Sequence, residues 1–156
     1  MTTTTLNPSL THRRGNTLVS PELFARLTAR ITKDHPELPP DMPARILDQA
    51  LAFLAAAALT TTPIGPSDLV DIGWHTFILH TRDYAAFCDR FAGRFIHHEP
   101  EDGSEWPTNP PSGTTPLAQA VAAITNAGYR LDLPLWRAAG ADCTQCHAGC
   151  HDSPTR

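Results

Sequence analysis

Asp71 and His75 are the first side chains in this 156-residue chain whose types and spacing could do chemistry. They lie in an apolar stretch, DIGWHTFILH, that has the composition of a core helix. Residues four apart on an α-helix are turned by only about 40° from each other, so both side chains would face one object. That object could be a metal ion or a proton that the carboxylate helps the imidazole to hold. The alternative is a hydrogen bond between two partly buried polar groups.

The thirty residues around this pair form a longer pattern. An Asp and a Trp-His pair are followed by a Tyr, a Cys, a Gly and a terminal His, and the positions are Asp71, Trp74, His75, Tyr84, Cys88, Gly93 and His98. This order resembles the bacterial members of the glycine-rich domain-containing protein-like family, a domain of unknown function first described in plant proteins. The later segment YRLDLPLW is similar to another part of that family, so the resemblance covers residues 20–145. The glycine-rich region itself is absent.

The resemblance implies a helical domain in which Asp71, His75 and His98 converge, and it implies no particular activity. Neighbouring residues of an extended segment point to opposite sides, so either His97 or His98 should reach the site, but not both. His80 lies about 140° round the helix from His75 and should face elsewhere. We expect the trio to bind one divalent metal, with zinc as the first choice. Phe77 stands where plant relatives often have a second histidine.

A second group of soft ligands lies near the C-terminus, in the segment CTQCHAGCH. Thiolates and imidazoles bind zinc, copper(I) and iron–sulfur clusters. The ligands would be Cys143, Cys146, His147, Cys150 and His151. We expect zinc here, with an iron–sulfur cluster, copper, a redox dithiol or a metal-free tail as alternatives. The segment also contains the C-x-x-C-H pattern of haem attachment, which the lack of a visible export signal disfavours.

Charge and composition narrow the class of protein. The net charge is −4, and no run of Lys and Arg appears, which disfavours nucleic-acid binding. The longest apolar run, ILDQALAFLAAAAL, contains Asp48 and Gln49 and is expected to be too short and too polar to span a membrane. Phosphate-binding loops and hydrolase motifs are absent from the sequence. We therefore expect a cytoplasmic protein whose cysteines are thiols or metal ligands.

Helical periodicity predicts the elements that position these residues. The expected helices begin after Ser20, run from about Pro43 to Leu59, extend from Ser67 to about His80, continue through RDYAAFCDRFAG to Gly93, and begin again at Thr115. Asp41 and Thr81 are expected to cap the second and fourth of these helices. No stretch alternates like a strand. The predicted fold is all-α, a compact bundle of about five helices with an irregular N-terminal arm and a Cys/His-rich tail.

The expected organisation is a flexible arm at residues 1–19, one helical domain at 20–140 and the tail at 141–156. The function most in keeping with the ligand types is a small metal-binding protein with a binding or accessory role. One alternative is a metal-dependent enzyme that uses a metal-bound water at the Asp/His/His site. Another is a protein-interaction module in which the Asp–His pair is structural. The substrate or protein partner is left open by the sequence.

Overall fold

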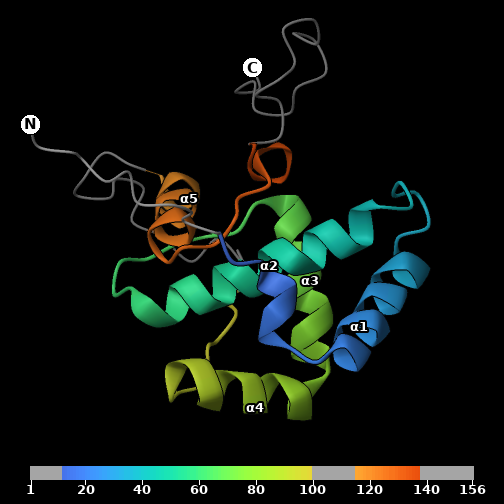
Figure 1. The fold of residues 1–156 in the computed structure, drawn as a ribbon, viewed down its shortest axis with the longest axis horizontal. Coiled ribbons are helices and arrows are strands. Elements are labelled where there is room, and N and C mark those ends of the chain that lie inside the picture. The colour runs from blue at the N-terminus through green and yellow to red at the C-terminus, as the bar shows by residue number, and fades with distance from the viewer. Residues whose placement is uncertain (1–11, 100–114, 138–156) are drawn as a thin grey trace, which may run out of the picture.

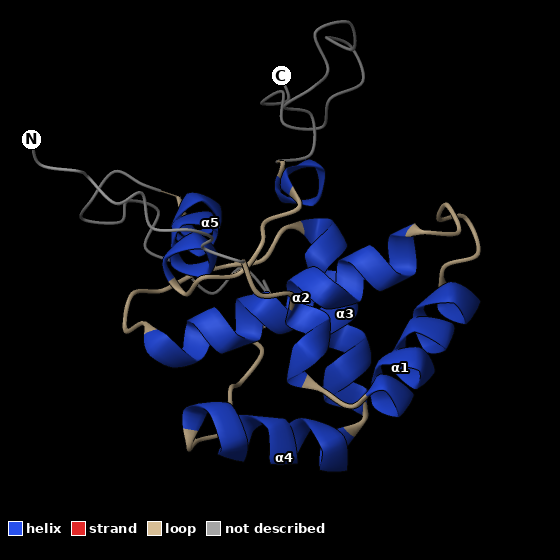
Figure 2. Ribbon diagram, in the orientation of Figure 1, coloured by secondary structure: helices blue, strands red, loops and turns tan. Residues whose placement is uncertain are grey.

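The computed structural model describes residues 12–99 and 115–137, drawn in colour in Figure 1. The helices are α1 (Pro21–Asp34), α2 (Met42–Leu59), α3 (Asp68–Leu79), α4 (Thr81–Ala92) and α5 (Pro116–Asn126), with 3-10 turns η1 (Gly15–Leu18) and η2 (Leu133–Trp136). No strand is drawn in the described ranges (Figure 2). Their only β pairing is one isolated bridge between Arg13 and Tyr129. The predicted all-α class and the five helices are confirmed.

Helix α2 is the centre of the fold, in contact with η1, α1, α3, α4 and α5 (Figure 1). Its residues from Gln49 to Ala56 are all buried, as expected for a helix with so broad an apolar face. The expectation about membrane spanning considered only residues 46–59, whereas the helix begins at Met42. Its 18 residues, of mean hydropathy 1.3, are long and apolar enough to cross a membrane, but 61% of them are buried within the chain. Such burial is typical of a core helix.

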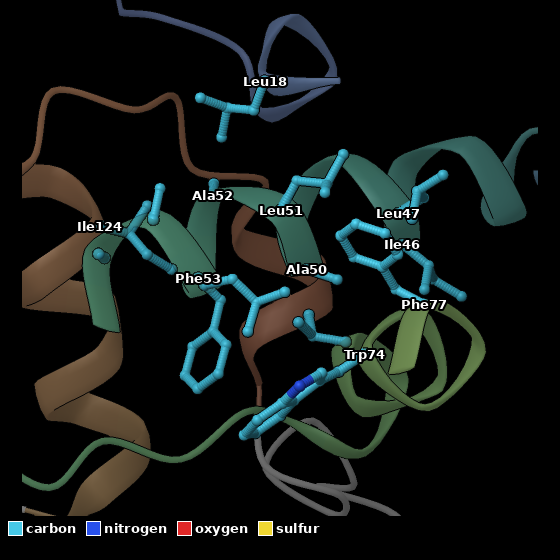
Figure 3. Close-up of a cluster of buried hydrophobic side chains, with 14 of the residues drawn as sticks. Leu18, Ile46, Leu47, Ala50, Leu51, Ala52, Phe53, Trp74, Phe77 and Ile124 are labelled. Carbon is cyan, nitrogen blue, oxygen red and sulfur yellow. The ribbon is translucent and has the colours of Figure 1, made fainter. Parts of the chain in front are cut away.

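A glycine allows α3 to approach α2 closely. A Cβ atom on Gly73 would lie 2.7 Å from the Cβ of Ala50 and 3.2 Å from Ile46, so a larger residue would push the helices apart. Trp74 and Phe77 point into the interface that this approach creates (Figure 3). The buried face of α3 is thereby fixed, which leaves a partly exposed face for polar residues.

Three of the predicted helix starts use the expected capping side chains. The hydroxyl oxygens of Ser20, Ser67 and Thr115 each accept a hydrogen bond of 3.2 Å from the backbone N–H three residues later. Such a bond satisfies one of the donors that a helix start leaves without an internal partner. The helix starts predicted at Ser20, Ser67 and Thr115 are confirmed.

Of the two other predicted caps, one has the predicted position and one does not. Asp41 is the N-cap residue of α2, as predicted, but its backbone is helical and its side chain makes no capping bond, because its carboxylate instead pairs with Arg45 at 3.2 Å. Thr81 is the first residue of α4 rather than its cap, because His80 takes the preceding position. A neighbouring guanidinium and a one-residue shift of the turn therefore decide how these helices begin.

Gln49 is the polar centre of an otherwise apolar helix and is 1% exposed. Its Oε1 accepts hydrogen bonds from Trp136 Nε1 (2.7 Å) and from the backbone N–H of Asp132 (3.0 Å). Its Nε2 donates to the backbone carbonyl of Arg130 (3.0 Å) and to the carboxylate of Asp48 (3.1 Å). One side chain therefore holds the connector between α5 and η2 across α2. Trp136 itself is buried.

The described part of the predicted N-terminal arm, residues 12–19, packs against α2. Leu18 is buried, and the backbone N–H of Asn16 donates to Asp48 Oδ1 at 2.9 Å. The backbone of Arg13 also bonds to that of Gly128 and Arg130. The arm and the connector are thereby joined over the same stretch of α2.

Replacement of Gln49 by Met is expected to destabilise the fold by about 3 kcal/mol. Methionine has a similar volume, but it leaves the Trp136 N–H, the Asp132 N–H and the Arg130 carbonyl without their partner, and each such group costs about 1–3 kcal/mol when buried. Urea unfolding followed by circular dichroism measures the change. A loss below about 1 kcal/mol would contradict the role of Gln49 as the structural centre.

Candidate metal site

Asp71 and His75 form the pair that their spacing predicts. His75 Nδ1 lies 3.1 Å from Asp71 Oδ2 and 3.0 Å from the backbone carbonyl oxygen of Asp71. Ser67 begins the helix one turn earlier, so Asp71 is in its first turn and His75 one turn later. The His75 side chain is 57% exposed and that of Asp71 is 29% exposed. The pair therefore lies at the surface edge of α3.

His98 joins this pair from the extended segment that follows α4. Its Nε2 lies 2.7 Å from Asp71 Oδ1, and its ring contacts those of Trp74 and His75, with centroid distances of 4.2 Å and 4.3 Å. The side chain of His98 is only 13% exposed. The donor atoms of Asp71, His75 and His98 all lie within 4.8 Å of one another, so that the three could hold a metal ion.

A hydrogen-bonded relay holds the segment that carries His98. Trp74 Nε1 donates to the hydroxyl of Tyr84 at 2.9 Å, and that hydroxyl donates to the backbone carbonyl of Ile96. Gly93 ends α4 in the left-handed conformation (φ 64°) and turns the chain back towards α3. Sequence reasoning named Tyr84 only as part of the pattern and missed this role of its hydroxyl. The signal was present, because a buried tyrosine generally requires a hydrogen-bond partner.

Burial in this relay changes the acidity of Tyr84. Loss of solvent raises the pKa of its hydroxyl well above the ordinary value, because the phenolate form would be charged inside the core. Cys88, which is also fully buried, raises the pKa of Tyr84 further, whereas the Trp74 N–H lowers it. Tyr84 is therefore a neutral donor, which the bond to the Ile96 carbonyl requires.

The structure places His97 and His80 outside the trio. The exposed His97 packs on Phe95 (4.9 Å between ring centroids), so that His98 is the residue that turns towards Asp71. His80 bonds through Nδ1 to the carbonyl of Thr76 at 2.9 Å and is not one of the trio, as expected. Phe77 is fully buried in the aromatic core.

The predicted C-terminal cluster, Cys143, Cys146, His147, Cys150 and His151, lies outside the described residues. It remains a sequence prediction.

The contacts of the trio define the chemistry that it can do. A carbonyl oxygen only accepts, so the Nδ1 of His75 carries the hydrogen when it bonds to the Asp71 backbone, and the carboxylate of Asp71 accepts from His98 as well. Ligand atoms around a tetrahedral zinc ion are about 3.3 Å apart. The observed separations are 2.7 Å from His98 to Oδ1 of Asp71 and 3.1 Å from His75 to Oδ2, so the two histidines meet different oxygens of the carboxylate. To hold a metal ion, the trio would give up the two shared protons and bring one donor atom from each residue to the ion.

Fold and site together define an all-α protein with an Asp/His/His group that could hold a metal ion. The chain belongs to the family described as UCP032817-like, whose sequence pattern matches residues 13–113. This range contains α1 to α4 and all three residues of the trio. Searches of the curated proteins and of the solved structures found no match. The family description carries no activity, so function has to be argued from the site.

Replacement of Tyr84 by Phe is expected to destabilise the fold by about 1–3 kcal/mol and to release His98. The variant keeps the ring but leaves the Trp74 N–H and the Ile96 carbonyl without a partner. Urea unfolding measures stability, and nuclear Overhauser contacts between the rings of Trp74 and His98 measure the position of His98.

The matched control for this variant is Tyr129→Phe. Tyr129 is also buried, but no hydrogen bond of its hydroxyl occurs among the described residues. Its replacement should change stability by less than about 0.5 kcal/mol and leave the Trp74–His98 contacts intact. Equal effects of the two variants would contradict the relay.

The raised pKa of Tyr84 predicts a loss of stability in alkali. An unfolded tyrosine ionises near its ordinary pKa of 10.0, whereas the folded Tyr84 resists ionisation. The stabilising contribution is therefore complete below about pH 10 and is lost as the pH rises beyond it. The chain has two tyrosines, so tyrosinate absorbance of Tyr129→Phe reports Tyr84 alone. Ionisation of Tyr84 near pH 10 while the chain stays folded would contradict this prediction.

Proposed function

We propose that this protein binds one divalent metal ion through Asp71, His75 and His98, and that zinc is the preferred ion. The observation that carries the proposal is the convergence of three donor atoms within 4.8 Å, supplied by α3 and by a segment 27 residues further along the chain from Asp71. A surface hydrogen bond between neighbours on one helix would not require the third residue. The partly buried His98 is placed by a dedicated relay, which supports a role beyond solvation.

The donor types support zinc. One carboxylate oxygen and two imidazole nitrogens are ligands that zinc accepts in tetrahedral sites, at distances of about 2.0–2.2 Å. The same donor set with open coordination positions also suits iron(II), so the affinity for zinc has to be compared with that for iron(II). Contacts of the His98 ring with the rings of Trp74 and His75 restrict its orientation and lower the conformational entropy lost on binding.

A binding or accessory role is the function that the ligand set supports best. Three protein ligands leave a fourth position, and the exposure of His75 (57%) places the trio at the surface. A ligand from a protein partner could complete the site there. The second candidate is a metal-dependent enzyme, in which the open position would hold a water that the metal acidifies.

A hydrogen-bonded network without metal is the third candidate. The bond from His75 Nδ1 to the carbonyl of Asp71 favours it, because that nitrogen is then already occupied. In this case the Asp–His pair would be structural and the protein would act as an interaction module. A cytoplasmic location, independence from nucleic acid and membranes, and kinship with the glycine-rich domain-containing proteins remain parts of the proposal that rest on sequence alone.

Metal titration of a chain without the C-terminal thiols tests the site. We expect Cys143→Ser/Cys146→Ser/Cys150→Ser, freed of metal by dialysis against a chelator, to bind one zinc ion per chain. Addition of Asp71→Asn or His98→Ala should abolish stoichiometric binding, because two ligands hold zinc much more weakly than three. Isothermal titration calorimetry measures this, and cobalt(II) substituted for zinc should give a spectrum of nitrogen and oxygen ligands without thiolate charge transfer.

The control for the histidine variants is His97→Ala. His97 neighbours His98 in the sequence but packs on Phe95 away from the trio, so its loss should leave the stoichiometry at one. Absence of zinc binding in the triple-serine chain, or equal loss in His97→Ala and His98→Ala, would refute the proposal. The wild type should bind a second ion if the C-terminal cluster is also a site, and Cys146→Ser should remove that ion alone.

A further inference from the structure

A groove apart from the metal trio lies beside Gln49. It is an open groove of about 570 Å³ between η1, α1, α2 and the connector that leads to η2. None of the metal trio lines it. Its lining combines charged and apolar side chains and includes Arg14, Asn16, Phe24, Arg45, Arg130 and Leu133.

Two arginines reach this groove from paired backbone segments. Arg13 and Tyr129 form a parallel bridge, and the backbone N–H of Arg130 donates to the carbonyl of Arg13 at 2.8 Å. Arg13 lies over the ring of the buried Tyr129. Side chains alternate along extended backbone, so the next pair, Arg14 and Arg130, shares the opposite face. Both side chains line the groove.

The groove is lined by three arginines, Arg14, Arg45 and Arg130, and by two aspartates, Asp48 and Asp132, so positive charge is in excess by one. Asp132 accepts from Arg45 Nε at 2.7 Å and from its Nη2 at 3.0 Å, and the charges of Arg45 and Arg130 both lower the pKa of this carboxyl group. Asp48 accepts from the backbone of Asn16 and from Gln49. Among the described residues, no carboxylate lies within 4.0 Å of the Arg14 or Arg130 guanidinium. The local charge is thus positive in a protein of net charge −4.

The groove also has an apolar wall. Phe24, Leu131 and Pro134 line it together with Leu133, which is 57% exposed. Apolar walls with a few convergent polar groups are typical of small-molecule sites.

We propose that this groove binds a small organic anion. The Arg14 and Arg130 guanidinium groups bind its carboxylate or phosphate head, and its apolar body packs on Phe24 and Leu133. Guanidinium groups suit this role because their planar forks donate paired hydrogen bonds to such oxygens. The site is independent of the metal trio and would remain if the trio binds no ion.

Titration with simple probes tests the groove. We expect phenyl phosphate or benzoate to bind the full-length protein saturably and to shift the NMR signals of the backbone amides of residues 130–133. The tighter of the two probes identifies the head group. Inorganic phosphate, which has no apolar body, should bind more weakly than phenyl phosphate. Arg14→Gln and Arg130→Gln should each weaken binding about tenfold, because each removes a charge-assisted hydrogen bond.

The matched control is Arg82→Gln, which removes the same charge from an exposed position on α4 outside the groove. It should leave the affinity unchanged within about twofold. Failure of both probes to bind, or equal weakening by Arg82→Gln and Arg130→Gln, would overturn the proposal. Inorganic phosphate that binds as tightly as phenyl phosphate would overturn the part assigned to Phe24 and Leu133.

Discussion

The burial of α2 is the constraint on which the rest of the structure depends. This helix is apolar almost all round, so other elements have to cover it on every side, and five of them do. Two features of α2 then decide how these elements attach to it. Ala50 and Ile46 meet Gly73 and let α3 approach closely, whereas Gln49 requires four polar partners and obtains them from residues on or beside the connector to η2 and from Asp48. The metal trio lies beside α3, which the contact at Gly73 joins to α2. The arginine groove lies beside the connector that Gln49 holds.

The geometry of the trio is a consequence of packing on α3. Once Trp74 is buried against α2, its indole N–H faces the core and needs an acceptor, which the Tyr84 hydroxyl supplies. Tyr84 in turn fixes the Ile96 carbonyl, and with it the direction of the chain two residues before His98. A neutral tyrosine is required for this, so the burial that raises its pKa also preserves the site. Stability and ligand position are therefore linked through one hydroxyl group.

Much of the fold could be predicted because its signals are local. Serine or threonine before an apolar periodic segment marked three helix starts, and Gly93 marked the end of α4. The predictions failed where a tertiary or neighbouring group competed for the same side chain. Asp41 has the right type for a cap, but the guanidinium of Arg45 one turn later attracts its carboxylate. The hydroxyl relay of Tyr84 was missed because a hydrophobic stripe shows that a residue is buried but does not show which polar atoms it meets.

The sequence by itself determined the Asp71–His75 pair, since helix geometry places residues four apart on one face whatever surrounds them. Resemblance added His98 as the third residue, and the alternation of extended backbone left His97 as its alternative. Only the tertiary structure decided between these two histidines, because the choice depends on the turn at Gly93 and on the bond that holds Ile96. The same holds for Arg14 and Arg130, which are 116 positions apart in numbering and share a face only through the bridge beside them. Contacts between distant segments follow from how whole helices pack, which no local pattern specifies.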